Sequence, residues 1–251
     1  MIYEASHFVF TPAPQVARAR RVLIKPAASY PFAHPLTTSP ETLKTVIDAI
    51  KKVSDADIII LEGTPTGEPI YPIYRALGYD FPHVLMLDVK DCIWVEVENP
   101  LLHPLAMATF WVPNVVLSSD YLISVAPYQI RNRNGFFTIP NLLSLLPIAK
   151  YGGQGPTAWS DLFQLGIQKV LADLYFTLPF DLGVIDARKK LVAEHDVTEG
   201  KVEDYDKTFI GEPYEVDTEA SIAGRVASEY LALIDAGRAE LEVPGTNGAS
   251  R

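Results

Sequence analysis

Lysine and hydroxyl side chains that follow the first apolar run of the chain could together bind an anion. Lys25 comes directly after that run, and Thr37, Thr38 and Ser39 stand at a helix start. A helix N-terminus presents free backbone N–H groups and the positive end of the helix dipole, and both favour an anion. A lysine adds a point charge for a carboxylate or a phosphate. These residue types in this order predict an anion site.

Two carboxylates at the ends of later apolar runs could perform acid–base chemistry. Glu62 follows one buried-type run and Asp186 ends another. A pair of carboxylates can act as general acid and base, and carboxylate oxygens are also ligands for magnesium or calcium. Arg131 and Arg133 follow a further run and are candidate anion ligands. None of these residues identifies a cofactor.

Each of these residues also has a purely structural interpretation. Lys25 could neutralise a carboxylate at a strand end. Thr38 and Ser39 could cap their helix, which is the usual role of hydroxyl residues at that position. Asp186 could accept hydrogen bonds from loop amides. The sequence leaves both interpretations open.

Several other kinds of site are excluded or disfavoured. The five histidines are scattered, with no pair at helical spacing. The glycine-rich run 151–156 lacks the lysine and Ser/Thr of a phosphate-binding loop and is expected to be a loop or lid. The single cysteine, Cys92, permits no internal disulfide and no cysteine-based metal cluster, and it is expected to be an inert thiol in a reducing cytoplasm.

A strand–helix–strand unit must position the first group of residues. The apolar run 22–24 predicts a strand that ends at Lys25 and a proline. Apolar residues at three- and four-residue steps predict a helix that starts near Thr38. The run 58–61 has four consecutive apolar residues, which indicates a parallel strand buried on both faces. Ligands of open α/β sheets bind outside the carboxyl ends of the strands, where Lys25 and Glu62 would lie.

The rest of the chain continues the alternation of strands and helices. We expect a three-layer α/β fold, with a mostly parallel mixed sheet and helices on both faces. Residues 1–243 are expected to form a single α/β domain, and 244–251 a disordered tail. The further expected elements are a short helix at 70–77, strands at 83–88 and 93–97, an edge piece at 112–117, a strand at 121–125, a helix at 157–176, a strand at 182–187 and a last helix at 218–236.

Composition narrows the class of protein and of partner. Of 251 residues, 48% are hydrophobic and 21% charged, which provides a large core. Residues 194–242 hold fourteen acidic and four basic residues, which accounts for the whole net charge of −10. The chain therefore lacks the basic face that a nucleic-acid binder needs. No apolar run approaches the roughly 20 residues of a membrane helix, so no membrane insertion is expected.

Four passages of the chain carry recognisable motifs in a fixed order. Residues 22–63 have a Lys-Pro strand end, a Thr-Thr-x-Pro-Glu helix start and a Glu-Gly strand end. The other three passages are residues 118–147, 180–187 with a Val-Ile-Asp strand, and 209–224. In this order they resemble the opening and the later segments of one bacterial and archaeal family, that of the domain of unknown function 362. The resemblance covers most of the chain and implies a shared fold and a shared map of polar positions.

The resemblance also shows where this chain departs from the family. The matching polar positions are Lys25, Thr37, Thr38, Glu62, Asp120, Asn141, Asp186 and Asp217. The resemblance therefore adds Asn141 to the candidate ligand-binding residues and Asp217 to the possible metal ligands. Ala27 replaces an asparagine, Arg131 to Arg133 replaces Lys-Thr-His, and Pro140 replaces a lysine. The ferredoxin-type cysteine segment of many members is absent.

Two hypotheses about function follow. The first is a cytoplasmic protein that binds an anionic small molecule at the strand ends, with or without catalysis. The alternative is a non-catalytic interaction or regulatory subunit that keeps the fold and has lost part of the polar site. A homo-oligomer or a separate redox partner is expected in either case, and a nucleic-acid role is not.

Overall fold

The computed structural model describes residues 1–152, 158–178, 180–194 and 197–242. Within these residues, eight strands form one sheet in the order β1-β10-β9-β7-β2-β3-β4, and β8 pairs with β7. The strands are β1 (Ile2–Glu4), β2 (Arg21–Pro26), β3 (Asp57–Glu62), β4 (Val84–Asp88), β7 (Tyr121–Arg131), β8 (Asn134–Phe136), β9 (Leu182–Ala193) and β10 (Lys201–Gly211).

The centre of this sheet is parallel, as the apolar runs predicted. Strands β9, β7, β2, β3 and β4 run in the same direction, whereas β10, β1 and β8 pair antiparallel with their neighbours. Ile58 to Leu61 in β3 are all buried, which is what four consecutive apolar residues in a central strand require. The mostly parallel mixed sheet is confirmed.

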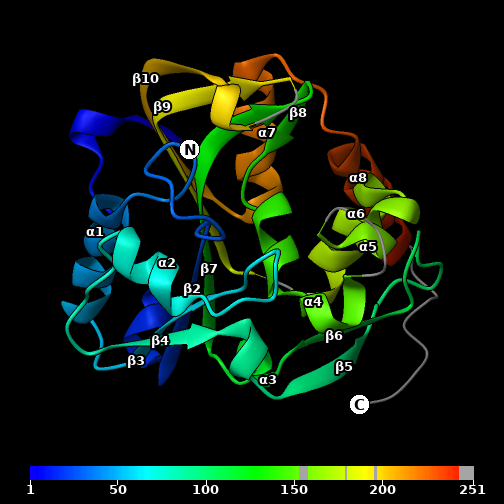
Figure 1. The fold of residues 1–251 in the computed structure, drawn as a ribbon, viewed down its shortest axis with the longest axis horizontal. Helices are drawn as coiled ribbons and strands as arrows, with labels where there is room; N and C mark the ends of the chain where they lie inside the picture. Colours follow the sequence, from blue (N-terminus) through cyan, green and yellow to red (C-terminus); the bar gives the residue numbers. More distant parts are fainter. Residues whose placement is uncertain (153–157, 179, 195–196, 243–251) are drawn as a thin grey trace.

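Helices cover both faces of the sheet, so the three-layer α/β class is confirmed (Figure 1). Along β2, Val22 and Ile24 pack into one core with α1 and α2, and Leu23 between them packs into the core on the other face. The helices of the first face are α1 (Pro40–Lys51) and α2 (Tyr71–Ala76). Those of the second face include α5 (Ser160–Gln164), α6 (Ile167–Thr177), α7 (Pro213–Gly224) and α8 (Glu229–Glu242).

Strand β7 is longer than its sequence predicts, and the extra length matters for the site. A strand over 121–125 was expected to end before Pro127, but β7 continues to Arg131. Proline is tolerated in a sheet at an irregularity in the ladder, and the register with β9 shifts between Pro127 and Tyr128. The continuation places Arg131 beyond the end of β2, which pairs with β7 only up to Val125.

The segment between 93 and 117 forms a small separate sheet. Strands β5 (Trp94–Glu98) and β6 (Thr109–Pro113) pair antiparallel with each other. The expected edge piece at 112–117 is therefore wrong in its bounds, because the strand ends at Pro113 and a short helix, α3 (Asn114–Leu117), follows. These elements pack on the same face as α5 and α6.

Two expected helices are each divided into two. The helix expected at 157–176 is broken at Gly166, whose φ of +89° is a conformation that glycine adopts most readily. The last helix, expected at 218–236, is α7 and α8, separated by Arg225 in a left-handed conformation. The expected tail at 244–251 lies outside the described residues.

The acidic segment after 194 contains a strand that the sequence did not predict. β10 is mostly charged over residues 201–207 and pairs with β9, which itself extends to Ala193. The remaining elements are α4 (Ile148–Tyr151) and the 3-10 turns η1 (Ala5–His7), η2 (Pro14–Arg18), η3 (Val89–Asp91), η4 (Pro140–Leu145) and η5 (Val197–Glu199).

Candidate functional site

Lys25 and Glu62 form an ion pair that is closed off from solvent. Lys25 lies near the end of β2, and Glu62 ends the neighbouring parallel strand β3. Lys25 Nζ lies 3.0 Å from Glu62 Oε2, and both side chains are 0% exposed. Burial lowers the pKa of Lys25, against the opposing attraction of the Glu62 carboxylate.

All three N–H donors of the Lys25 ammonium have a protein acceptor. Nζ donates to the carbonyl of Pro26 at 2.7 Å, to Glu62 Oε2 at 3.0 Å and to Asn141 Oδ1 at 3.1 Å. An ammonium has three N–H donors and no acceptor. In this arrangement Lys25 therefore has no donor left for a ligand.

The Glu62 carboxylate and the Asn141 amide tie the strand ends together. Glu62 accepts hydrogen bonds from the N–H groups of Ala28, at 2.8 Å, and Gly63, at 2.9 Å. Asn141, in η4, donates to the carbonyl of Lys25 and to Ser124 Oγ of β7, both at 3.1 Å. The cluster therefore fixes η4 against the ends of β2 and β3.

Thr37 and Thr38 hold the loop that leads into α1. Thr37 Oγ1 donates to the carbonyl of Phe32. Thr38 Oγ1 donates to the carbonyl of Val125 at 2.6 Å and accepts from the N–H of Ala27 at 2.9 Å. Both threonines are buried, so their hydroxyls face protein groups.

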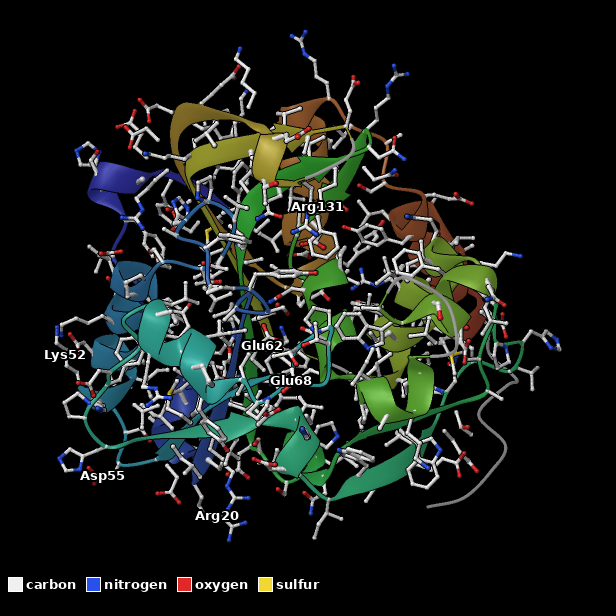
Figure 2. All side chains as sticks on the ribbon, in the orientation of Figure 1. Arg20, Lys52, Asp55, Glu62, Glu68 and Arg131 are labelled. Carbon is white, nitrogen blue, oxygen red and sulfur yellow. The ribbon has the colours of Figure 1, made fainter. Side chains whose placement is uncertain are left out.

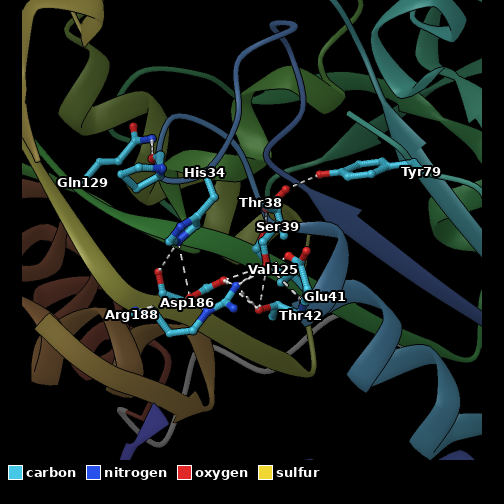
Figure 3. Close-up of polar contacts among 11 residues, drawn as sticks. His34, Thr38, Ser39, Glu41, Thr42, Tyr79, Val125, Gln129, Asp186 and Arg188 are labelled. Carbon is cyan, nitrogen blue, oxygen red and sulfur yellow. Dashed lines mark hydrogen bonds and ion pairs between the residues drawn. The ribbon is translucent and has the colours of Figure 1, made fainter. Parts of the chain in front are cut away.

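Asp186 is the centre of a second polar cluster, at the start of α1 (Figure 3). The hydroxyl oxygen of Ser39 caps α1 by accepting a hydrogen bond from the N–H of Thr42. The hydroxyl groups of Ser39 and Thr42 each donate to Asp186 Oδ2, at 3.0 and 2.7 Å respectively. Arg188 donates to both carboxylate oxygens, at 3.0 and 2.8 Å, and His34 Nε2 lies 3.4 Å from Oδ1. Asp186 is 1% exposed.

The surroundings of Asp186 keep it ionised. Burial alone would raise its pKa, but the hydrogen bonds from His34, Arg188 and Thr42 outweigh that effect and hold the pKa far below its usual range.

Glu62 ends β3 and Asp186 lies on β9, with β7 and β2 between those strands. Three strand spacings are roughly 14 Å, so the structure does not bring the two carboxylates together as an acid–base pair.

Asp217 and Asp120, two other positions of the family resemblance, each accept hydrogen bonds from a distant segment of the chain. Asp217 accepts from the N–H groups of Thr138 and Ile139, both at 2.9 Å, from the Thr138 hydroxyl at 2.6 Å and from the Tyr230 hydroxyl at 2.9 Å. Burial raises the pKa of Asp217 to about 6, against these hydrogen bonds. Asp120 accepts from two backbone N–H groups at the start of β2.

A cavity of about 500 Å³ opens where β2, β3 and β7 end. In Figure 2, Arg20 and Asp55 precede β2 and β3 and lie low in the view, whereas Glu62 and Arg131 lie above them toward the carboxyl ends. The residues that line the cavity are Ala27, Ser29, Tyr30, Leu36, Pro65, Thr66, Arg131, Phe136, Pro140, Asn141, Leu143, Ser144, Ala158, Trp159 and Phe163.

Arg131 is the cation of this cavity. Its guanidinium carbon lies 4.0 Å from the centre of the Phe136 ring. Over the described part of the chain, no carboxylate lies within ion-pair distance of it. Burial lowers the pKa of Arg131 to about 10, against an opposing effect of Tyr30.

Gln129 orients the guanidinium. Its amide nitrogen donates to the carbonyls of Pro35, at 2.5 Å, and Leu36, at 2.9 Å, which leaves its oxygen facing Arg131. Arg131 donates to that oxygen through Nε, at 2.8 Å, and through Nη2. The loop before α1 therefore holds the Arg131 guanidinium in place, because the Gln129 amide bonds to both.

The structure therefore separates the residues predicted from the sequence. Arg131 and Asn141 line the cavity, and Lys25 and Glu62 lie beside it in a closed cluster. Ser39 and Asp186 belong to the other cluster, and Arg133 is exposed in the turn between β7 and β8.

Sequence reasoning did not identify Gln129 or the aromatic residues of the cavity. Gln129 stands two positions before Arg131 in the same strand, and that spacing places both side chains on one face. This signal could have found it once the strand was extended past Pro127. Tyr30, Trp159 and Phe163 come from a loop and from around α5, and no local pattern distinguishes them from core residues.

Other kinds of site have little support in the structure. Among the described residues, no group of three His, Cys, Asp or Glu side chains is placed to hold a metal ion. Burial and the nearby Asp88 and Asp91 raise the pKa of the Cys92 thiol to about 11, which agrees with an inert thiol. No helix in the described ranges is long and apolar enough to cross a membrane.

Comparison with known proteins identifies the family. The model of the domain of unknown function (DUF362) matches residues 22–220. The chain belongs to this family, as the resemblance in its sequence indicated. The search of curated proteins gave no match.

Proposed function

We propose that this DUF362 protein binds an anionic small molecule, a carboxylate or a phosphate, in the cavity at the strand ends. The observation that carries the proposal is Arg131, which lines the cavity and has no carboxylate partner among the described residues. We place this binder in the cytoplasm, the compartment that a lone cysteine favours.

The energetics of a half-buried cation support an anionic ligand. A charge removed from water is costly unless it is paired and hydrogen-bonded. A guanidinium has five N–H donors, and Arg131 directs two of them to Gln129. The other three have no partner among the described residues, so a ligand anion would supply both the missing charge and the missing acceptors.

The lining also favours an anion over a cation. None of the lining residues is an aspartate or a glutamate. Four hydroxyl side chains, those of Ser29, Tyr30, Thr66 and Ser144, lie around the same space. Both N–H groups of the Asn141 amide already donate to protein acceptors, so the role that we give Lys25, Glu62 and Asn141 is to hold η4 in place as a wall of the cavity.

Ligand-dependent thermal stability in matched variants tests the proposal. The probes are inorganic phosphate, succinate and benzoate, and the proteins are wild type, Arg131→Gln and Arg133→Gln. The two variants remove the same charge from one hairpin, but only Arg131 faces the cavity. At a probe concentration ten times Kd, binding adds about 1.4 kcal/mol, which raises Tm by roughly 2–4 °C in a protein of this size.

The expected result is that at least one probe raises Tm of wild type and Arg133→Gln but not of Arg131→Gln. If no anion raises Tm, or if Arg131→Gln responds as wild type does, the proposal is wrong. A failure of that kind would favour the alternative of a non-catalytic interaction or regulatory subunit.

A further inference from the structure

We infer that the ligand of the cavity is a carboxylate attached to a flat aromatic body, an inference that rests on the proposed function. The first reason is charge. Among the fifteen described residues that line the cavity, Arg131 is the one charged side chain. A single guanidinium neutralises a carboxylate, whereas a phosphate monoester at pH 7 carries roughly −1.5 to −2 and would leave negative charge unmatched.

The second reason is the part of the guanidinium that stays open. Phe136 covers one face of the Arg131 guanidinium, and Gln129 accepts from the side of Nε and Nη2. What remains is the edge formed by Nη1 and the second Nη2 hydrogen. That edge matches the two oxygens of a planar carboxylate, which can accept two parallel hydrogen bonds in the guanidinium plane.

The third reason is the aromatic lining. Tyr30, Phe136, Trp159 and Phe163 reach the cavity from three different segments. Phe163 is 50% exposed and Tyr30 is 43% exposed, so folding alone leaves these two rings partly uncovered. A flat aromatic body would cover ring surface here and gain the extra attraction of aromatic pairs.

The size of the cavity sets the size of the probe. A volume of about 500 Å³ falls within the range of pockets that bind drug-sized ligands. A two-ring acid uses this space better than a single ring, so 2-naphthoate is the test compound. Three comparison compounds each change one feature of it. Octanoate replaces the aromatic body by an alkyl chain, 2-naphthyl phosphate replaces the carboxylate by a phosphate, and the neutral 2-naphthamide removes the charge.

Isothermal titration calorimetry of the full chain with these four compounds tests the inference. We expect 2-naphthoate to bind about tenfold more tightly than octanoate, because the aromatic contacts are lost in octanoate. We expect it also to bind more tightly than 2-naphthyl phosphate, and 2-naphthamide to show no measurable binding. Arg131→Gln is expected to lose binding of all three anions.

Variants of the exposed rings test the aromatic contact itself. Tyr30→Leu and Phe163→Leu are each expected to weaken 2-naphthoate several-fold and to leave octanoate nearly unchanged. Both positions are partly exposed, so the variants are expected to fold. The matched control is Tyr3→Leu, which changes a ring of similar exposure, 38%, on the distant strand β1.

The outcomes separate this inference from the proposed function. If octanoate binds as tightly as 2-naphthoate, or if the ring variants bind 2-naphthoate as wild type does, the aromatic body is wrong while the anion site stands. If 2-naphthyl phosphate binds more tightly, the carboxylate is wrong and the anion site again stands. If no anion binds, both proposals fail.

Discussion

Removing one partner of the Lys25–Glu62 pair is expected to destabilise the protein strongly. Lys25→Met leaves the Glu62 carboxylate buried without its cation, and it leaves Asn141 Oδ1 and the Pro26 carbonyl without the ammonium donor. Both charged side chains are 0% exposed, so solvent cannot compensate. Truncating one member of a buried pair costs about 3–5 kcal/mol.

The geometry supports a loss of that size. At the 3.0 Å separation of Nζ and Oε2, two unit charges attract by about 5.5 kcal/mol at an effective dielectric constant near 20. Glu62→Gln is expected to cost at least as much as Lys25→Met. Both carboxylate oxygens of Glu62 accept hydrogen bonds from N–H groups, and a glutamine must place its NH2 group against one of them.

A double-mutant cycle measured by urea unfolding checks this reasoning. The double variant Lys25→Met/Glu62→Gln is expected to lose less than the sum of the single losses, with a coupling of roughly 2 kcal/mol. The matched control is the exposed pair of Lys44 and Asp48 on α1, 2.5 Å apart with side chains 65% and 48% exposed. Lys44→Met and Asp48→Asn are each expected to cost no more than about 0.5 kcal/mol.

Two results would refute the closed pair. One is a Lys25→Met loss as small as that of Lys44→Met. The other is strict additivity in the Lys25 and Glu62 cycle. Either result would mean that the Lys25 ammonium is not held as the structure places it, and Lys25 would again be a candidate for binding the ligand.

Three further outcomes are expected. Without ligand, the free energy of unfolding of Arg131→Gln should equal that of wild type or exceed it by up to about 1 kcal/mol, because the variant lacks a cation that has no carboxylate partner among the described residues and is partly screened in an open cavity. A loss above about 2 kcal/mol in urea unfolding would contradict this. Because burial raises the pKa of Asp217 to about 6, the folded state binds more protons than the unfolded state between about pH 4 and 6. The free energy of unfolding should therefore fall as pH rises through that window, by up to about 3 kcal/mol. In a profile of Tm against pH, Asp217→Asn should lack this fall. Arg188→Gln should cost about 1–2 kcal/mol at pH 7, since Arg188 is 40% exposed. The folded pKa of Asp186 is depressed, so that cost should shrink as pH falls below about 4, while the exposed control Lys189→Gln should show no cost at either pH.

The local features of the fold could be predicted from the sequence. The run Ile58 to Leu61 indicated a strand buried on both faces, and β3 is such a strand. Apolar spacing indicated a helix that starts near Thr38, with Thr38 or Ser39 as its cap, and Ser39 caps α1. Burial pattern and capping depend on neighbours along the chain, so the residues themselves carry this information.

The elements that were predicted wrongly depend on contacts from elsewhere in the chain. The continuation of β7 past Pro127 requires the ladder with β9, whose register shifts there. The acidic residues of β10 form a strand because β9 pairs with them. Composition alone could not show the extension of β7 or the existence of β10, because the strand that pairs with each of them, β9, is a separate segment of the chain.

By itself, the sequence determined the α/β class, the family and the polar residues that lie near the strand ends. Only the tertiary structure decided what each polar residue contacts. Lys25 is held by Glu62 and by Asn141, which is 116 positions away, whereas Arg131 lines a cavity and has no carboxylate partner in the described part of the chain. The physical reason is that an apolar run records burial but not the order of strands in the sheet. That order sets which charges meet and which stay free for a ligand.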